Sequence, residues 1–493
     1  MPAPVTRRGF LAGSASVVAV LTALHSRRAV AASRASRSVE GPYGSLRPVA
    51  DLETALPLIL LPEGFSYRTF SWSGDAMPGG APTPDQHDGM GVIATNGSGD
   101  DLEVTLVRNH ERPVTSPILA PSRYDKSSHL KAGLGPGGGT TTLKFRGKRW
   151  TGVEPSLGGT IFNCAGGVTP WGTWLSCEET LIDLSAREGR RHGYIFEVRG
   201  DAAATTAKPI VDMGRMKHEA AAIDPVTKIA YLTEDQPGHS GFYRFLPKDT
   251  SGMPGSYEAG GRLQSASVSG RRNADLRNPR VGDFHHIDWV DIADPDQSPG
   301  VEPSTVSRLS KEASGPSVQA WNAGALWLSK AEGISQHAGK FYVVDSEAGL
   351  DVLRRPGHGD GAVWEYDPAN STLRAIFVAG SQIVGDNIDN ITVSPRGGIL
   401  MCEDGDPVTD RYGPGTRLIG LTGEGDSYAF AKNNINLSTG QLVTAGKHVP
   451  PDDYRGEEWA GACFDANGEV LFVNIQTPGI TFAIWGPWER GNL

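Results

Sequence analysis

Short apolar runs of strand composition recur along the chain in a shared plan. In each copy, a small or acidic start leads into one apolar strand, a turn follows, and a second apolar strand ends in acidic or amide residues. The clearest copy spans 389–405, where Asp389-Asn390-Ile391 opens the first strand and Cys402-Glu403-Asp404 closes the second. A third, aromatic-rich strand often follows, as in Val363-Trp364-Glu365-Tyr366. Runs rich in β-branched and aromatic residues and bounded by turn residues favour strands.

The repeat predicts the architecture. Further copies begin near Asp88, Asn163, His218, Ala331 and Trp459. Self-similar units of several strands are typical of propellers, so we predict an all-β fold, a six-bladed β-propeller. The longest gap between copies, about 250–320, is rich in Ser, Gly, Asp and Pro, and we expect an inserted loop or subdomain there. The alternative architecture is a β-sandwich with appended domains.

The N-terminal segment 1–31 reads as an export signal rather than as part of the fold. It combines Arg7-Arg8 before Phe10-Leu11, a short run rich in small apolar residues, and Ala29-Val30-Ala31 as a cleavage site. Paired arginines predict the twin-arginine translocase as the export partner. We therefore expect 32–493 to form one exported domain, in a periplasm-like space, at the cell wall or in the medium. An uncleaved anchor helix is the alternative, but the run is short and polar for a membrane span.

The net charge of the chain limits the classes of partner that it is expected to bind. The chain carries a formal net charge of −10, and removal of 1–31 takes away four arginines and no acid, which gives −14. Such acidity disfavours nucleic acid and anionic membranes as partners. The sequence also contains no Walker loop, no G-x-S-x-G elbow and no H-E-x-x-H helix.

The repeat also predicts where the acids gather. In an antiparallel hairpin, the start of the first strand and the end of the second strand share one edge, and innermost strands line a propeller axis. Each copy would therefore deliver its opening and closing residues to one face. Pairs such as Glu219 with Glu234, and Asp389 with Glu403, would converge there. Crowded carboxylates require cations, and calcium prefers six to eight oxygen ligands.

Four cysteines add a softer donor. Two disulfides are one possibility in an oxidising compartment. Alternatively Cys177, which precedes Glu178 and Glu179, is a free thiolate in the acidic cluster and favours a transition metal such as iron. We interpret Cys164, Cys402 and Cys463 as core thiols.

Several motifs resemble the PhoX alkaline phosphatases over nearly the whole mature chain. The most specific is the run Thr169-Pro170-Trp171-Gly172-Thr173-Trp174-Leu175-Ser176-Cys177-Glu178-Glu179. The others are Arg108-Asn109-His110-Glu111, Gly138-Gly139-Thr140-Thr141-Thr142, Lys217-His218-Glu219-Ala220, Glu332-Gly333, Asp389-Asn390-Ile391, Cys402-Glu403-Asp404-Gly405 and the stretch from Phe472 to Ala483.

The resemblance implies an exported six-bladed propeller that carries Ca²⁺ and Fe³⁺ and releases phosphate from organic phosphomonoesters. We predict Lys330, Cys177 and Glu219 as catalytic residues. The predicted metal ligands are Asn109, Glu111, Cys177, Glu178, Glu219, Glu234, Glu332, Asp389, Asn390, Glu403 and Asp404. Lys330 departs from the arginine expected two residues before Glu332, and lysine lacks the bidentate fork of arginine.

Two other functions remain open at this point. One is a calcium-dependent propeller hydrolase of the lactonase or phosphotriesterase kind, which needs no thiolate. The other is a non-catalytic binding propeller stabilised by calcium. For the phosphatase we expect small-molecule phosphate esters as substrates and a monomeric protein.

Overall fold

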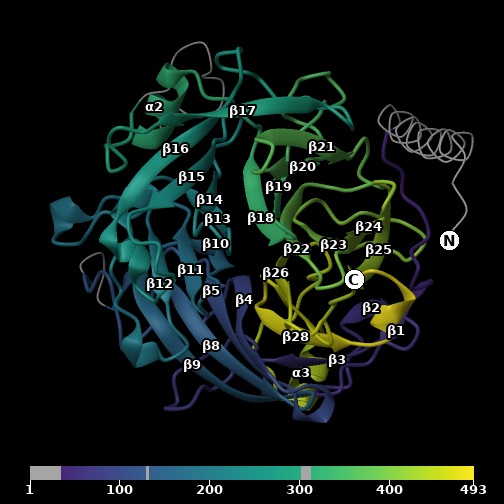
Figure 1. The fold of residues 1–493 in the computed structure, drawn as a ribbon. Coiled ribbons are helices and arrows are strands. Elements are labelled where there is room, and N and C mark those ends of the chain that lie inside the picture. Colours follow the sequence, from purple (N-terminus) through teal and green to yellow (C-terminus); the bar gives the residue numbers. More distant parts are fainter. Residues whose placement is uncertain (1–34, 129–132, 301–312) are drawn as a thin grey trace, which may run out of the picture.

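The computed structural model describes residues 35–128, 133–300 and 313–493. The predicted export signal, 1–31, lies outside the described residues. Within them, most of the strands form six blades, two of which are joined in one nine-stranded sheet, and the blades follow one another in sequence order around a central axis (Figure 1). The propeller prediction is therefore confirmed, and the sandwich alternative is excluded. In the described part of the chain, no helix is both long and apolar enough to cross a membrane.

The blades follow the predicted repeat. Blade 1 contains β4 (His87–Asn96), β5 (Glu103–His110), β8 (Gly138–Arg146) and β9 (Arg149–Thr160). Blade 2 contains β10 (Asn163–Val168), β11 (Trp174–Glu178) and β12 (Ile195–Val198). Blade 3 contains β13 (His218–Ile223), β14 (Ala230–Glu234), β15 (Phe242–Pro247) and β16 (Gly261–Val268). Blade 4 contains β18 (Ala331–His337), β19 (Lys340–Asp345), β20 (Ala362–Asp367) and β21 (Thr372–Val378).

The last two blades recruit strands from the start of the chain. Blade 5 contains β22 (Ile388–Val393), β23 (Ile399–Glu403), β24 (Arg417–Leu421) and β25 (Ser427–Asn433), extended by β2 (Ile59–Pro62) and β1 (Leu46–Val49). Blade 6 contains β26 (Trp459–Phe464), β27 (Leu471–Ile475), β28 (Ile480–Trp485) and β3 (Ser66–Phe70). The antiparallel pairing of β3 with β28 ties a strand from the start of the chain to the last strand and closes the ring.

The described parts of the segment 250–320 contribute outer strands to blades 3 and 4. It contains β16, then β17 (Phe284–Asp291), and then the start of α2 (Gly315–Ala323). β17 pairs with β16 of blade 3 and with β21 of blade 4, so these two blades share one continuous sheet. The remaining elements are a short strand pair, β6 (Val114–Thr115) with β7 (Gly135–Pro136), and helix α3 (Thr439–Ala445), which begins with a capping box formed by Ser438 and Gln441.

The core is distributed between the blades. One cluster joins Leu106 and Phe145 of blade 1 to Phe472 of blade 6, and comparable buried apolar clusters lie between the other neighbouring blades. Burial of these faces fixes the blades around the axis.

The inner strands are β4, β10, β13, β18, β22 and β26, and neighbouring inner strands contact each other around the axis. Small residues allow this close approach. A Cβ atom added at Gly89 would lie 2.5 Å from Cα of Ala165 on the next blade, which is too close for any side chain. Toward the end of the axis where the first two strands of each blade turn, the strands enclose a cavity of about 360 Å³ lined mainly by glycine, alanine and short polar residues.

Candidate metal centre

Every inner strand carries one extra residue at its start. In blade 3, His218 pairs with Glu234 and Ala221 pairs with Leu232, so three steps on β13 face two steps on β14. The same shift occurs in the inner strands of the other blades. A bulge of this kind bends the strand and re-aims its side chains. The first bulged residue is Asp88, Cys164, Glu219, Glu332 and Asp389 in blades 1 to 5.

These re-aimed side chains form three overlapping clusters of metal-binding type. Cys164 lies with Glu179 and Glu219, Glu219 lies with Glu332 and Asp389, and Asp389 lies with Asp404 and Glu458. Within each cluster, one candidate ligand atom from each residue lies within 4.8 Å of those of the other two residues. Glu219 belongs to the first two clusters and Asp389 to the last two, so the three clusters form one connected centre.

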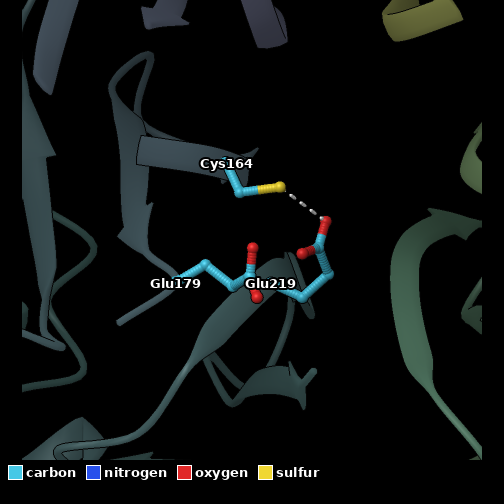
Figure 2. A group of neighbouring side chains, drawn as sticks. All are labelled: Cys164, Glu179 and Glu219. Atoms are coloured by element: carbon cyan, nitrogen blue, oxygen red, sulfur yellow. Dashed lines mark hydrogen bonds between the residues drawn. The ribbon is translucent and has the colours of Figure 1, made fainter. Parts of the chain in front are cut away.

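The only sulfur in these clusters belongs to Cys164. Its thiol donates to Oε1 of Glu219 at 3.2 Å, and Figure 2 shows the two side chains pointing toward each other with Glu179 beside them. The Cys164 and Glu219 side chains are buried. Burial, and after it the carboxylates of Asp88 and Glu219, raise the pKa of the Cys164 thiol.

The carboxyl groups repel one another strongly. Burial raises the pKa of Glu219, and the neighbouring charges of Glu332 and Asp389 raise it further. Burial and the charge of Asp389 likewise raise the pKa of Asp88 and of Asp404 to about 7. Acids crowded together in this way are stable only when protons or cations neutralise them. The arrangement therefore fits bound cations.

Among the described residues, the basic side chain that reaches this centre is that of Lys330. Nζ of Lys330 lies 2.5 Å from Oε1 of Glu332 and 3.5 Å from Oδ2 of Asp235. Burial alone would lower the pKa of Lys330, but the carboxylates of Glu332 and Asp235 raise it, so the side chain stays an ammonium ion. A quarter of the side chain is exposed, so Lys330 lies between the buried centre and the solvent. The structure thus places Lys330, a predicted catalytic residue, beside Glu332 of the centre.

Where two acids close a second strand, the first of them supports the fold. Glu178 accepts hydrogen bonds from the backbone N–H groups of Ile161 and Gly193, at 2.9 Å each, and pairs with the His192 ring at 2.6 Å. Burial alone would lower the pKa of His192, but Glu178 and Asp125 raise it to about 9. Glu178 is thus held away from the axis, whereas the next residue, Glu179, joins the centre.

The same division recurs in later blades. Glu234 accepts hydrogen bonds from the hydroxyl groups of Tyr243 and Ser314, and Glu403 accepts two from the Arg417 guanidinium, at 2.8 and 2.5 Å. None of Glu178, Glu234 and Glu403, all three predicted as metal ligands, belongs to the three clusters, and each is instead hydrogen-bonded to donors of the surrounding fold. The physical reason is strand alternation, because adjacent residues at a strand end face opposite ways.

Cys177 is likewise not at the centre. Its side chain is fully buried in the apolar cluster between blades 2 and 3, together with Met213, Met216 and Tyr243. Cys177 lies on the middle strand β11, where its side chain faces the neighbouring blade. The thiol of the centre therefore comes from Cys164, which sequence reasoning had assigned to the core. Cys402 is in the core as predicted, and the four cysteines are free rather than paired in disulfides.

The predicted amide ligands mainly hold backbone. Asn109 donates to the carbonyl oxygens of Cys164 and Ala165 at 2.8 and 2.7 Å, and so fixes the bulge that presents the thiol. Asn390 accepts from the backbone N–H of Gly461 at 3.1 Å. Asn390 also donates to Oδ2 of Asp389 at 3.2 Å, and so contacts a carboxylate of the centre.

Glu111 lies at the edge of the centre. Its Oε2 accepts from Nε2 of Gln476 at 2.9 Å, and the same amide group donates to Asp88 at 3.0 Å. Burial, with the charges of Asp88 and Asp389, raises the pKa of Glu111. Gln476 therefore bridges two acids of the centre.

Sequence reasoning missed Cys164, Glu179, Glu458, Asp88 and Asp235. A usable signal was present for some of them. The first bulged residue is followed by a small one in Asp88-Gly89, Cys164-Ala165, Glu219-Ala220 and Glu332-Gly333. The twin acids Glu178-Glu179 and Glu234-Asp235 also mark where one acid supports the fold and the next faces inward.

Fold and site together define a β-propeller with a carboxylate-rich centre at its axis, containing one thiol and one lysine. The family described as alkaline phosphatase PhoX matches residues 42–156 and 120–479. Because these matches cover most of the sequence, the chain belongs to the PhoX alkaline phosphatase family. Phosphomonoester hydrolysis is the activity of this family.

The chain also resembles solved structures. Pseudomonas fluorescens PhoX in complex with vanadate, a transition state analogue, is similar with a TM-score of 0.59 and 16% identity, and the match covers 93% of this chain and 99% of that chain. A gluconolactonase from Xanthomonas campestris matches with a TM-score of 0.38 and 10% identity, covering 92% and 98% of the two chains. A search of curated proteins finds no match.

Proposed function

We propose that the axial centre binds metal ions and that this protein is an exported, metal-dependent phosphomonoesterase. The observation that carries the proposal is the chain of three clusters linked through Glu219 and Asp389. Family membership supplies the reaction, and the cluster geometry supplies a place for it. Export of 32–493 by the twin-arginine route and a monomeric state complete the proposal.

The donor types suggest which ions are held. Cys164 with Glu179 and Glu219 combines a thiolate with oxygen donors, a mixture that favours a transition metal, and we propose Fe³⁺ there. The clusters around Asp389 contain only carboxylate oxygens, which suit Ca²⁺. When bound, these cations would neutralise phosphate oxygens and stabilise the charge that develops in the transition state.

The protein's own side chains contribute orientation. Lys330 presents an ammonium group at the rim, 2.5 Å from Glu332, where it can contact a phosphate oxygen of an entering ester. The backbone of Lys330 is held in place by Asp345, whose carboxylate accepts a hydrogen bond from the Lys330 backbone N–H at 2.9 Å. Lysine offers a point charge rather than a fork, so we expect it to attract the phosphate without fixing its rotation.

A thiol within the centre argues against a site built only for calcium. A calcium-only hydrolase needs oxygen donors alone, and here Cys164 lies among them. We therefore favour the phosphatase over the lactonase and phosphotriesterase alternative.

The experiment compares two glutamates of the same blade. We expect Glu219→Gln to lower phosphate release from nitrophenyl phosphate by about 100-fold or more, because it removes a charge shared by two clusters. Glu234→Gln is the matched control, since Glu234 is equally buried but bonded to Tyr243 and Ser314, and it should retain most of the rate. Equal losses in both variants, with both proteins folded, would contradict the proposed site.

A further inference from the structure

A second cavity opens beside the metal centre, between blades 1 and 6. It has a volume of about 550 Å³, within the range of roughly 300–1,000 Å³ usual for small-molecule pockets. Its walls come from the connection between β3 and β4, the loop after β5, the chain before β26, and the turn between β27 and β28. We call it the proline-lined pocket, after Pro82, Pro84, Pro117, Pro155, Pro450 and Pro478.

The pocket shares a wall with the centre. Gln476 lines the pocket, and its amide nitrogen donates to Asp88 and to Glu111. Gln86 also lines the pocket, and its backbone carbonyl oxygen accepts a hydrogen bond from the backbone N–H of Glu111 at 2.9 Å. A substrate with its phosphate in the centre could thus place its organic group in the pocket without crossing a blade.

The chemistry of the walls differs sharply from that of the centre. Besides the prolines, the pocket is lined by apolar side chains that include Met77, Ile118, Leu119 and Val449. Arg112 is neutralised by Asp85, with Nε 2.6 Å from the carboxylate, and it donates further hydrogen bonds to backbone carbonyl oxygens. An uncharged, apolar group therefore fits this space better than a charged one.

Two features make the pocket preformed. Proline fixes its own backbone dihedral, so the walls lose little freedom when a ligand binds. Tyr454 is also tied in place, because its hydroxyl donates to the carbonyl oxygen of Pro450 at 2.7 Å. Met77, Ile118 and Val449 are at most 6% exposed, so the floor is packed rather than open.

We propose that the proline-lined pocket binds the organic group of the phosphate ester, and that it selects substrates with an apolar ring over those with a small or charged group. This inference rests on the proposed phosphatase function. It assigns the metal centre to the phosphate and the pocket to the leaving group.

The test varies an exposed wall residue. Leu119 lines the pocket at 72% exposure, so Leu119→Asp introduces a charge without disturbing the core. We expect kcat/KM for naphthyl phosphate to fall by about tenfold or more, as is usual when an apolar contact is lost from a binding pocket. The value for methyl phosphate should change much less, because its organic group is too small to fill the pocket. Ser116→Trp, which adds bulk at the pocket rim, should have the same selective effect.

Leu353→Asp is the matched control. Leu353 is 71% exposed, is not part of the pocket lining and lies in the loop after β19, so this variant measures the effect of an added negative charge alone. It should leave the ratio of the two kcat/KM values unchanged. If Leu119→Asp lowers both substrates equally, or leaves naphthyl phosphate unaffected, the pocket does not bind the organic group.

A binding measurement separates this inference from the proposed function. Calorimetry with naphthylphosphonate and methylphosphonate, which are not hydrolysed, should show tighter binding of the naphthyl compound to the metal-loaded protein. Leu119→Asp should abolish that preference. If the wild-type protein hydrolyses neither ester but keeps the preference, the phosphatase proposal fails and the pocket stands. If the protein is active but binds both phosphonates equally, the pocket proposal fails alone.

Discussion

Exchanging the two buried thiols of blade 2 distinguishes a structural cysteine from a ligand. Cys177 lies in an apolar cluster and is fully buried, so Cys177→Ser places a hydroxyl group among Met213, Met216 and other apolar side chains. An unpaired buried hydroxyl costs about 1–3 kcal/mol. We expect the free energy of unfolding to fall by that amount, with metal content unchanged.

Cys164→Ser should behave in the opposite way. The serine hydroxyl can still donate to Glu219, which the thiol contacts at 3.2 Å, so the cost to folding of the metal-free protein should stay below about 1 kcal/mol. The soft donor is lost, however, so the protein should lose its iron and nearly all phosphate release.

The assay combines urea unfolding of the metal-free variants, elemental analysis of the purified proteins, and phosphate release from nitrophenyl phosphate. The two variants should separate cleanly, one losing stability and the other losing iron. Loss of iron in Cys177→Ser with full iron in Cys164→Ser would refute the assignment of the thiol and the bulge argument behind it.

Three further outcomes are expected. Arg417→Met leaves the carboxylate of Glu403 buried without its guanidinium and should cost about 3–5 kcal/mol in chemical unfolding, and a cost below 1 kcal/mol would contradict the buried pair. Lys330→Gln should weaken inhibition by inorganic phosphate, and an unchanged inhibition constant would remove Lys330 from the phosphate site. The free energy of unfolding of the metal-free protein should fall as the pH rises from about 4 to about 7. The reason is that Asp88 and Asp404 keep their protons in the folded protein, where their pKa is about 7, while the same groups ionise near 3.8 in the unfolded chain. The fall should reach about 1.4 kcal/mol per pH unit for each retained proton. Added calcium should remove this pH dependence. If the thermal-unfolding temperature of the metal-free protein did not change with pH, the proposed crowding of protonated acids would be contradicted.

The propeller could be predicted from the sequence because its repeat is local. Hairpin geometry brings the two ends of each copy to one face, and this reasoning placed Glu219, Glu332 and Asp389 near one another, as they are in the structure. Asp404 was included only because of the family resemblance. The closure of the ring by β3 was not foreseen, because that strand pairs with β28 at the other end of the sequence.

The site errors have one physical origin. The alternation of residues along a strand predicts which way each side chain faces only where the strand pairing is regular. The inner strands contain a one-residue bulge where the site begins, so the prediction fails there. Because of the bulge, the side chain of Cys164 points into the centre. At the end of the second strand of blade 2, the sequence prediction chose Glu178, whereas the structure places the next residue, Glu179, in the centre. Both shifts depend on pairing between strands, which one sequence does not display.

The central claim is that phosphate release depends on metal ions held in the axial centre. The most direct measurement is the rate of phosphate release from nitrophenyl phosphate by the mature protein, taken before chelation, after removal of metal, and after return of calcium and iron. We predict loss of the rate on metal removal and its recovery on reconstitution. An undiminished rate in protein shown to be metal-free, or no phosphate release from folded and fully loaded protein, would contradict the account.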